Sequence, residues 1–126
     1  MKKIFVATVC AVMAASAFAT DWQRYASSEN FTVFVATDRV KKQNGIVTVW
    51  SKWVYVKPRS TADGRPYEYT ISQDLVNCAA GSSRTMSSTA YNGNGESVKS
   101  STNPSNWEAA VPDSVMETVI GKVCSI

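Results

Sequence analysis

The residue types that most often carry catalysis are scarce in this sequence. There is no histidine, which removes the commonest general base. No serine lies in a Gly-x-Ser-x-Gly nucleophile elbow, and no glycine-rich phosphate-binding loop occurs. Glu68 and Asp74 share one face of an expected strand, but a separation of ~20 Å is too large for a glycosidase pair. The sequence therefore predicts a protein that is not an enzyme and that needs no cofactor or metal.

Two cysteines, Cys78 and Cys124, lie beyond the N-terminal apolar run. A zinc site needs four ligands, and no histidine or second cysteine pair supplies the remainder. In an oxidising compartment these two cysteines have only each other as partners, so we expect a Cys78–Cys124 disulfide. In the chain-entropy model, closing this loop stabilises the fold by about 3–4 kcal/mol.

Residues 1–19 have the three parts of a secretory signal peptide. Lys2 and Lys3 supply a positive start, residues 4–15 are almost wholly apolar, and residues 17–19 form a small-x-small cleavage site. The apolar run falls short of the ~20 residues that span a bilayer, so we expect no transmembrane segment. We expect the signal peptide to be cleaved and the protein to be exported.

Removal of the signal peptide changes the meaning of the charge and cysteine content. The remaining domain, residues 20–126, has eleven basic and ten acidic residues, because two of the thirteen basic residues belong to the signal. Nucleic-acid binding needs clustered positive charge, so a near-neutral domain argues against a nucleic-acid partner. Cys10 lies inside the apolar run rather than at its end, and we interpret it as a signal residue, not a lipid attachment site.

Two groups of side chains are candidates for binding a partner. The first is basic and is expected to lie on two segments that face each other: Arg39, Lys41, Lys42, Lys57, Arg59 and Arg65. These residues form either a solvated rim or a site for an acidic protein or polyanion. The second group is aromatic: Trp50, Trp53, Tyr55, Tyr67 and Tyr69. These residues either fill the core or present a protein interface, where Trp and Tyr are enriched.

The first half of the domain is expected to form strands. Runs rich in β-branched and aromatic residues predict strands at 22–26, 31–36 and 46–56. The third run is apolar on both faces, so we expect it to be central and covered on both. Asn44-Gly45 predicts a tight turn just before it, and residues 57–66 predict a loop because of their prolines, glycine and small polar side chains.

The second half is expected to complete the sheet and then to form a helix, because the spacing of its apolar residues changes from that of a strand to that of a helix. Residues 67–75 alternate and predict a strand whose even-numbered side chains face water. A polar hairpin is expected at 84–101, and Trp107 is expected to fill the core from a loop. Ser114 and Glu117 form a capping box, and apolar spacing predicts a helix over 114–124. The fold class is α+β: a single antiparallel β-sheet of five or six strands with a C-terminal α-helix packed on it.

The chain carries its landmarks in a distinctive order: Trp22, Asp38-Arg39-Val40, Val47-x-Val49-Trp50, Tyr67, Leu75-x-x-Cys78, Tyr91 before Gly95, Trp107, and Pro112-x-Ser114 opening a helix that ends in Cys124. This order and spacing resemble the surface-adhesin protein E family of Gram-negative bacteria over residues 22–124. The resemblance implies an antiparallel sheet with a C-terminal helix, in the periplasm or at the outer surface. It leaves a homodimer open and, for the founding adhesin, implies binding to host matrix and plasma proteins.

The sequence therefore leaves two functional hypotheses. The first is a non-enzymatic secreted or envelope protein resembling surface adhesin E, which binds host matrix proteins or polyanions. The alternative is a soluble periplasmic inhibitor or accessory protein of an envelope hydrolase, for which the 57–66 loop is the protruding element.

Overall fold

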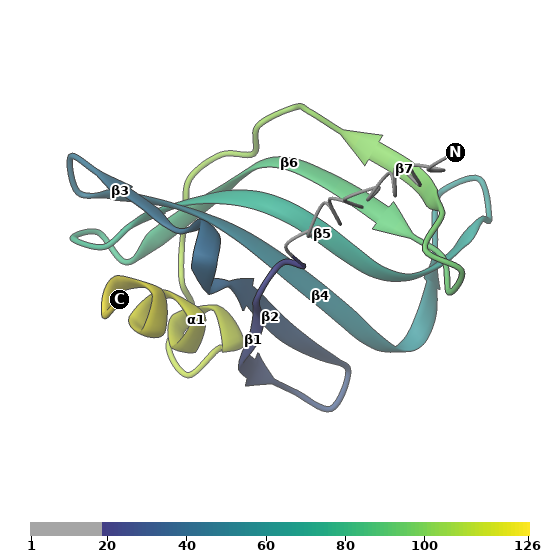
Figure 1. The fold of residues 1–126 in the computed structure, drawn as a ribbon, viewed down its shortest axis with the longest axis horizontal. Coiled ribbons are helices and arrows are strands. Elements are labelled where there is room, and N and C mark those ends of the chain that lie inside the picture. The colour runs from purple at the N-terminus through teal and green to yellow at the C-terminus, as the bar shows by residue number, and fades with distance from the viewer. Residues whose placement is uncertain (1–18) are drawn as a thin grey trace, which may run out of the picture.

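The computed structural model describes residues 19–126 of the 126-residue chain. The expected signal peptide, apart from Ala19, and Cys10 lie outside the described residues. The described part forms an eight-stranded antiparallel sheet with one α-helix, α1 (Val115–Cys124), packed on one side (Figure 1). The α+β fold with its C-terminal helix is as expected, but the sheet has eight strands instead of five or six.

The strands on the main path of the sheet follow the order β1-β2-β4-β5-β6-β7. Their bounds are β1 (Trp22–Ser27), β2 (Phe31–Ala36), β4 (Ile46–Ser60), β5 (Pro66–Asn77), β6 (Ser82–Tyr91) and β7 (Ser97–Ser101). Two short strands lie off this path: β3 (Lys41–Gln43) pairs with β4, and β8 (Glu108–Ala109) pairs with β6. A 3-10 turn, η1 (Thr37–Arg39), connects β2 to β3. The two short strands account for the underestimate, since three and two residues are too few to show an alternating pattern.

The predicted Asn44-Gly45 turn joins β3 to β4. Both residues have positive φ, 53° and 78°, as a type I′ hairpin turn requires. Asparagine tolerates this left-handed conformation and glycine adopts it without a steric penalty. The local sequence therefore determines this hairpin.

The predicted loop over 57–66 is largely wrong, because β4 continues to Ser60 and β5 begins at Pro66. The β4–β5 ladder is irregular between Val54 and Arg59, and Pro58, which has no N–H to donate, lies in this irregular part. Pairing resumes from Arg59 onward, so the true loop is only 61–65. Composition alone cannot reveal this continuation, since a partner strand stabilises it.

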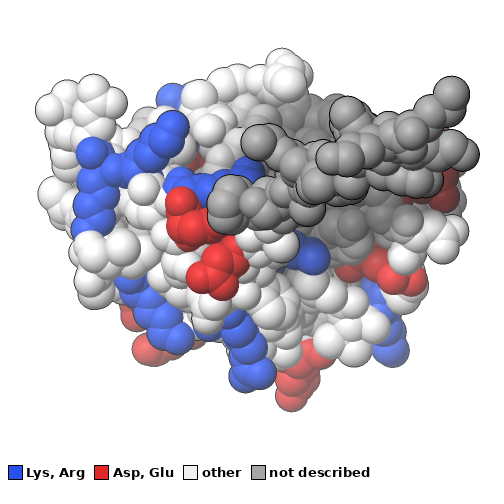
Figure 2. Space-filling view, in the orientation of Figure 1, with Lys and Arg blue, Asp and Glu red and all other residues white. Residues whose placement is uncertain are grey.

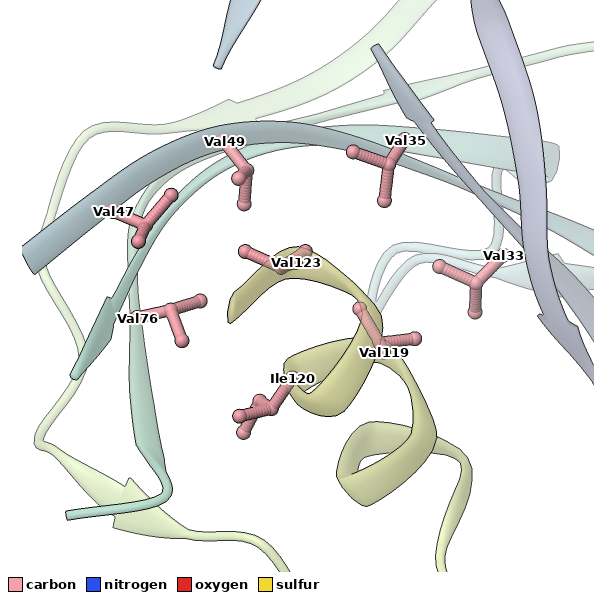
Figure 3. Packing of buried hydrophobic residues seen from close by; sticks show 8 residues of the cluster. All are labelled: Val33, Val35, Val47, Val49, Val76, Val119, Ile120 and Val123. Carbon is pink, nitrogen blue, oxygen red and sulfur yellow. The ribbon is translucent and has the colours of Figure 1, made fainter. Parts of the chain in front are cut away.

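The core lies between one face of the sheet and α1. Val33, Val35, Val47, Val49 and Val76 come from three strands and are at most 3 % exposed. They contact Val119, Ile120 and Val123 on the apolar face of the helix, under the arch of the sheet (Figure 3). Burying each such side chain contributes about 1.5–3 kcal/mol, so this cluster is the main driving force for docking the helix.

The capping box at the start of α1 forms with one change. The Ser114 hydroxyl accepts a hydrogen bond from the backbone N–H of Glu117 at 3.2 Å, as expected. The Glu117 carboxylate accepts from the N–H of Asp113 at 3.3 Å, one residue before the expected partner. At the other end of the helix, the Lys122 ammonium donates to the Tyr25 carbonyl oxygen at 2.6 Å, which attaches α1 to β1.

The predicted disulfide between Cys78 and Cys124 is confirmed. The two Cα atoms are 5.8 Å apart and the sequence separation is 46. Cys78 follows the last residue of β5 and Cys124 ends α1. The bond therefore fixes the C-terminal end of the helix to the sheet.

The predicted orientation of β5 is wrong. Ser72 and Asp74, expected to face water, are 8 % and 9 % exposed. Asp74 pairs with Val49 and Ser72 pairs with Ser51, so they lie on the helix side of the sheet. Alternation shows which side chains share a face but not which face is covered. The odd-numbered side chains of β5, such as Ile71, turn to the opposite face.

Trp107 also departs from its predicted role in the core. Its side chain is 41 % exposed, and the Arg84 guanidinium lies 5.7 Å from the ring centroid. The predicted 84–101 hairpin is present as β6 and β7.

Candidate functional site

The predicted basic residues divide into two groups at opposite ends of β4. Lys41 and Lys42 pair with the beginning of β4, and Arg39 lies just before them in η1. Lys57 and Arg59 lie in the last part of the same strand. Lys42 pairs with Val47, and Lys57 lies ten residues further along β4. At ~3.3 Å per residue the two groups are ~33 Å apart along the strand, so the six residues do not form one site. In Figure 2 the visible basic side chains are interspersed with acidic ones rather than gathered in one patch.

Several of these basic residues already have partners. The Lys42 ammonium donates to the carbonyl oxygen of Ile126. The Arg59 guanidinium lies 4.3 Å from the centroid of the Tyr55 ring. Arg65 forms an ion pair with Asp63 at 3.0 Å. The pKa of Asp63 is lowered, first by the hydrogen bond from the Thr61 hydroxyl and then by Arg65.

The sheet also divides the predicted aromatic group. Trp53 turns to the helix side, where its ring lies 4.8 Å from that of Phe31 and packs against the core. Tyr55 meets Tyr67 edge to face at 5.8 Å near the irregular part of β4. Trp50 and Tyr69 belong to the opposite face, because they alternate with the buried side chains of β4 and β5. The core interpretation therefore holds for Trp53 and not for Trp50.

The sheet face directed away from α1 is termed the open face. Within residues 19–126, no helix or strand packs over it. The strand register assigns these partly exposed side chains to it: Trp22, Phe34, Trp50, Lys52, Tyr69, Ile71 and Tyr91. Aromatic and aliphatic side chains thus make up most of a surface that faces solvent.

Lys52 lies at the centre of the open face. Its ammonium is 4.7 Å from the centroid of the Tyr69 ring and 6.0 Å from that of Trp22. Tyr69 in turn stacks on Tyr91 with ring centroids 5.0 Å apart. Within residues 19–126 Lys52 forms no ion pair. Aromatic rings stabilise the cation without neutralising it, so its charge is available to a ligand.

A hollow of about 200 Å³ lies on the open face next to Lys52. Its walls include Trp22 from β1, Trp50 from β4 and Ile71 from β5, and Thr20 and Arg39 complete the lining. We call this hollow the tryptophan slot. It combines apolar walls with a cationic side chain, which is typical of a binding site that orients its ligand by a few polar groups.

Trp22, Lys52 and Tyr91 were not expected to bind a partner. The sequence does indicate the orientation of Lys52. Successive side chains of a strand point to opposite faces, so Lys52 must share a face with Trp50 and not with Trp53. That signal does not reveal that this face is the uncovered one. Trp22 and Tyr91 join the surface only through strand pairing.

The buried carboxyl group of Asp74 lies on the helix side of the sheet. It accepts a hydrogen bond from the Ser51 hydroxyl at 2.6 Å. Burial raises its pKa, and hydrogen bonds from Ser51 and Thr85 oppose this shift.

Neither a metal-binding cluster of three or more Cys, Asp or Glu side chains nor a helix able to cross a membrane occurs in residues 19–126.

A model of the surface-adhesin protein E family matches residues 22–125. The chain belongs to this family. Its fold is similar to that of Haemophilus influenzae protein E, with a TM-score of 0.61 and 14 % identity over 85 % of this chain and 89 % of that one. A second crystal form of that protein gives a TM-score of 0.55 and 12 % identity, over 85 % and 96 % of the two chains. No curated protein matches the sequence. The predicted family resemblance is confirmed.

Proposed function

We propose that this adhesin E family member is a non-enzymatic envelope protein that binds an extracellular protein or polyanion through the open face of its sheet. The observation that carries the proposal is the uncovered aromatic surface around Lys52, whose charge is unpaired within residues 19–126. Tryptophan and tyrosine are among the residues that most often dominate binding energies. A large apolar surface that faces water is otherwise an aggregation hazard, which a partner removes.

The two basic groups at the ends of β4 have a weaker claim to be the primary site. Their side chains are exposed, and an exposed charge pair contributes at most about 1 kcal/mol. Arg65 is already paired with Asp63. Arg39 lines the tryptophan slot. We assign the other five residues to the rim, where they affect association rate and salt dependence more than affinity.

Three observations support export of the protein to the cell envelope. The chain belongs to a surface-adhesin family. The Cys78–Cys124 disulfide persists only in an oxidising compartment. Residues 1–19 have the organisation of a cleavable signal, which leaves residues 20–126 as the exported domain. We propose that this domain is displayed at the outer surface of a Gram-negative cell.

Surface labelling combined with adhesion tests this function. One sample of intact cells that express the full sequence is treated with a membrane-impermeant amine label, and a second, unlabelled sample is applied to immobilised extracellular-matrix proteins. We expect labelling of the protein and retention of the cells, with retention reduced by Trp50→Ala. Trp107→Ala is the matched control, since it removes another partly exposed tryptophan outside the slot. Protein found only in the soluble periplasmic fraction, with no label, contradicts the adhesin function.

A soluble periplasmic inhibitor is the second candidate, and the β4–β5 hairpin is the observation in its favour. Val56 is 67 % exposed near the base of this hairpin. The tip is rigidified because the Thr61 N–H donates to the Arg65 carbonyl at 2.9 Å and the Arg65 N–H donates to the Thr61 hydroxyl at 3.0 Å. Inhibition of an envelope hydrolase by the purified protein, lost when residues 61–65 are replaced by Asn-Gly, would favour this candidate.

A further inference from the structure

Three Asn-Gly dipeptides lie in turns of this domain, at 44–45, 92–93 and 94–95. The first joins β3 to β4, and the other two lie between β6 and β7. An asparagine that precedes glycine can lose its side-chain amide without an enzyme, because glycine has no Cβ to hinder attack by its backbone nitrogen. The attack needs a free asparagine side chain, a free glycine N–H and open space around both. The three dipeptides differ in these conditions.

Asn44-Gly45 meets all of the conditions. Both residues are exposed. The hydrogen bonds of this hairpin are those of the β3–β4 ladder and the one from Lys42 to Ile126. Within residues 19–126 the Asn44 side chain and the Gly45 N–H therefore have no partner. A methyl group placed on Gly45 would have no atom within 4 Å, so the space beside its nitrogen is open.

The β3–β4 hairpin also opens at little cost. Ring closure between the Gly45 nitrogen and the Asn44 side chain distorts the tight turn, so the hairpin has to open briefly. β3 has three residues, all exposed, and it pairs only with β4, at one end of the sheet (Figure 1). Its release uncovers no buried side chain of β3. Segments with few buried contacts are the ones that open most often in a folded protein.

Asn92-Gly93 is protected on both sides of the reaction. The Asn92 Oδ1 atom accepts the N–H groups of Asn94 and Glu96, both at 3.0 Å, which holds the side chain in place. The carboxylate of Glu68 occupies the space at Gly93, where an added methyl group would lie 2.8 Å from Oε2. The negative charge of this carboxylate opposes formation of an anionic nitrogen at Gly93.

Asn94-Gly95 lacks a free nucleophile. The Gly95 N–H donates to the Asn92 carbonyl oxygen at 3.0 Å. In the same turn the Asn92 N–H donates to the Glu96 carbonyl oxygen at 3.0 Å. The turn between β6 and β7 must therefore lose its backbone hydrogen bonds before the Gly95 nitrogen can attack.

We propose that Asn44 is a site of spontaneous deamidation and that it reacts before Asn92 and Asn94. The Gly45 nitrogen loses its proton to water and attacks Cγ of Asn44. The N–Cγ bond forms, the Cγ–Nδ2 bond breaks, and Nδ2 takes up a proton and leaves as ammonia. Water then opens the succinimide ring at either carbonyl carbon, which gives aspartate or isoaspartate. One water molecule is consumed for each ammonia released. The proposal does not depend on the function proposed above.

The modification changes the charge and the backbone of the hairpin. Both products place a carboxylate close to Lys41 and Lys42 and lower the net charge of the domain. Isoaspartate also adds a methylene group to the main chain, so the two-residue turn no longer fits the pairing of Gln43 with Ile46. In that product we expect β3 to detach from β4 and Lys42 to release the Ile126 carbonyl.

Timed incubation of the purified protein tests the proposal. The protein is expressed from its full sequence and kept at neutral pH, and ammonia release, cation-exchange elution and peptide mass mapping are followed. We expect the peptide with Asn44 to exchange NH₂ for OH first, with earlier elution of the modified protein. The rate at Asn44 should exceed that at Asn92 or Asn94 at least about tenfold, because the latter must first give up two hydrogen bonds. Enzymatic methylation of isoaspartate identifies that product.

Two controls separate the effect of the fold from that of the dipeptide. In urea, with the disulfide intact, all three dipeptides should react at similar rates, since the protecting hydrogen bonds are lost. Asn44→Gly retains a residue that adopts positive φ, so the turn is kept while the reactive amide is removed. This variant should lose the early release of ammonia. Asn94→Gly is the matched change in the other turn and should leave the rate at Asn44 unaltered.

The outcomes decide the proposal. Early modification of Asn44 in the folded protein, with equal rates in urea, supports it. Reaction of Asn92 or Asn94 as fast as Asn44 in the folded protein overturns it, because the hydrogen bonds of their turn then give no protection. An Asn44 that stays intact in the folded protein while all three dipeptides react in urea overturns it as well, because the β3–β4 hairpin then does not open.

Discussion

Removal of the Cys78–Cys124 disulfide should destabilise this domain more than any other change to the C-terminal helix. The perturbation is the double variant Cys78→Ala with Cys124→Ala. The closed loop has a sequence separation of 46, for which the chain-entropy model gives about 4 kcal/mol at room temperature. A ten-residue helix is marginal by itself, and α1 buries only Val119, Ile120 and Val123. Without the bond, these three side chains and the hydrogen bond from Lys122 to the Tyr25 carbonyl must hold it.

Urea unfolding followed by circular dichroism and tryptophan fluorescence measures this effect. We expect the free energy of unfolding to fall by about 4 kcal/mol, a large share of the roughly 5–15 kcal/mol typical of such domains. Reduced wild-type protein is the control, because it retains both thiols and loses only the bond. A decrease below about 1 kcal/mol in both proteins would refute the reasoning, since it would mean that the bond does not constrain the unfolded chain.

Three further predictions concern the core and the helix cap. Burial raises the pKa of Asp74, so the folded state favours the protonated carboxyl group. The contribution of this group to the free energy of unfolding is therefore present at low pH and is lost as the pH rises through the raised pKa. Asp74→Asn keeps an acceptor for Ser51 without the charge, so its thermal unfolding midpoint should exceed that of wild type at neutral pH and depend less on pH; a lower midpoint contradicts this. Val123→Ala should cost about 2 kcal/mol in urea unfolding because Val123 is fully buried, whereas Val56→Ala, at 67 % exposure, should change stability by less than about 0.5 kcal/mol. Ser114→Ala should cost about 1 kcal/mol through loss of the helix cap, and equal urea midpoints for variant and wild type would show that the cap is dispensable.

Features with a local physical cause were predictable from the sequence. The Asn44-Gly45 turn follows from the backbone conformations these residues tolerate. The helix start at Ser114 follows from its side-chain hydrogen bond. The short strands β3 and β8 were not predictable, since their residues adopt extended structure only beside β4 and β6. The extension of β4 past Pro58 has the same cause.

The candidate site was only partly predictable for a related reason. Alternation along β4 places Trp50 and Lys52 on one face and Trp53 on the other, which the sequence by itself determines. It cannot say which face is covered, and it suggested that Asp74 faces water. The tertiary structure decided both questions, because the valines that bind α1 come from three strands and form one surface only after the sheet has assembled. With the helix and its disulfide on that side, Trp22, Trp50 and Lys52 are left together on the open face.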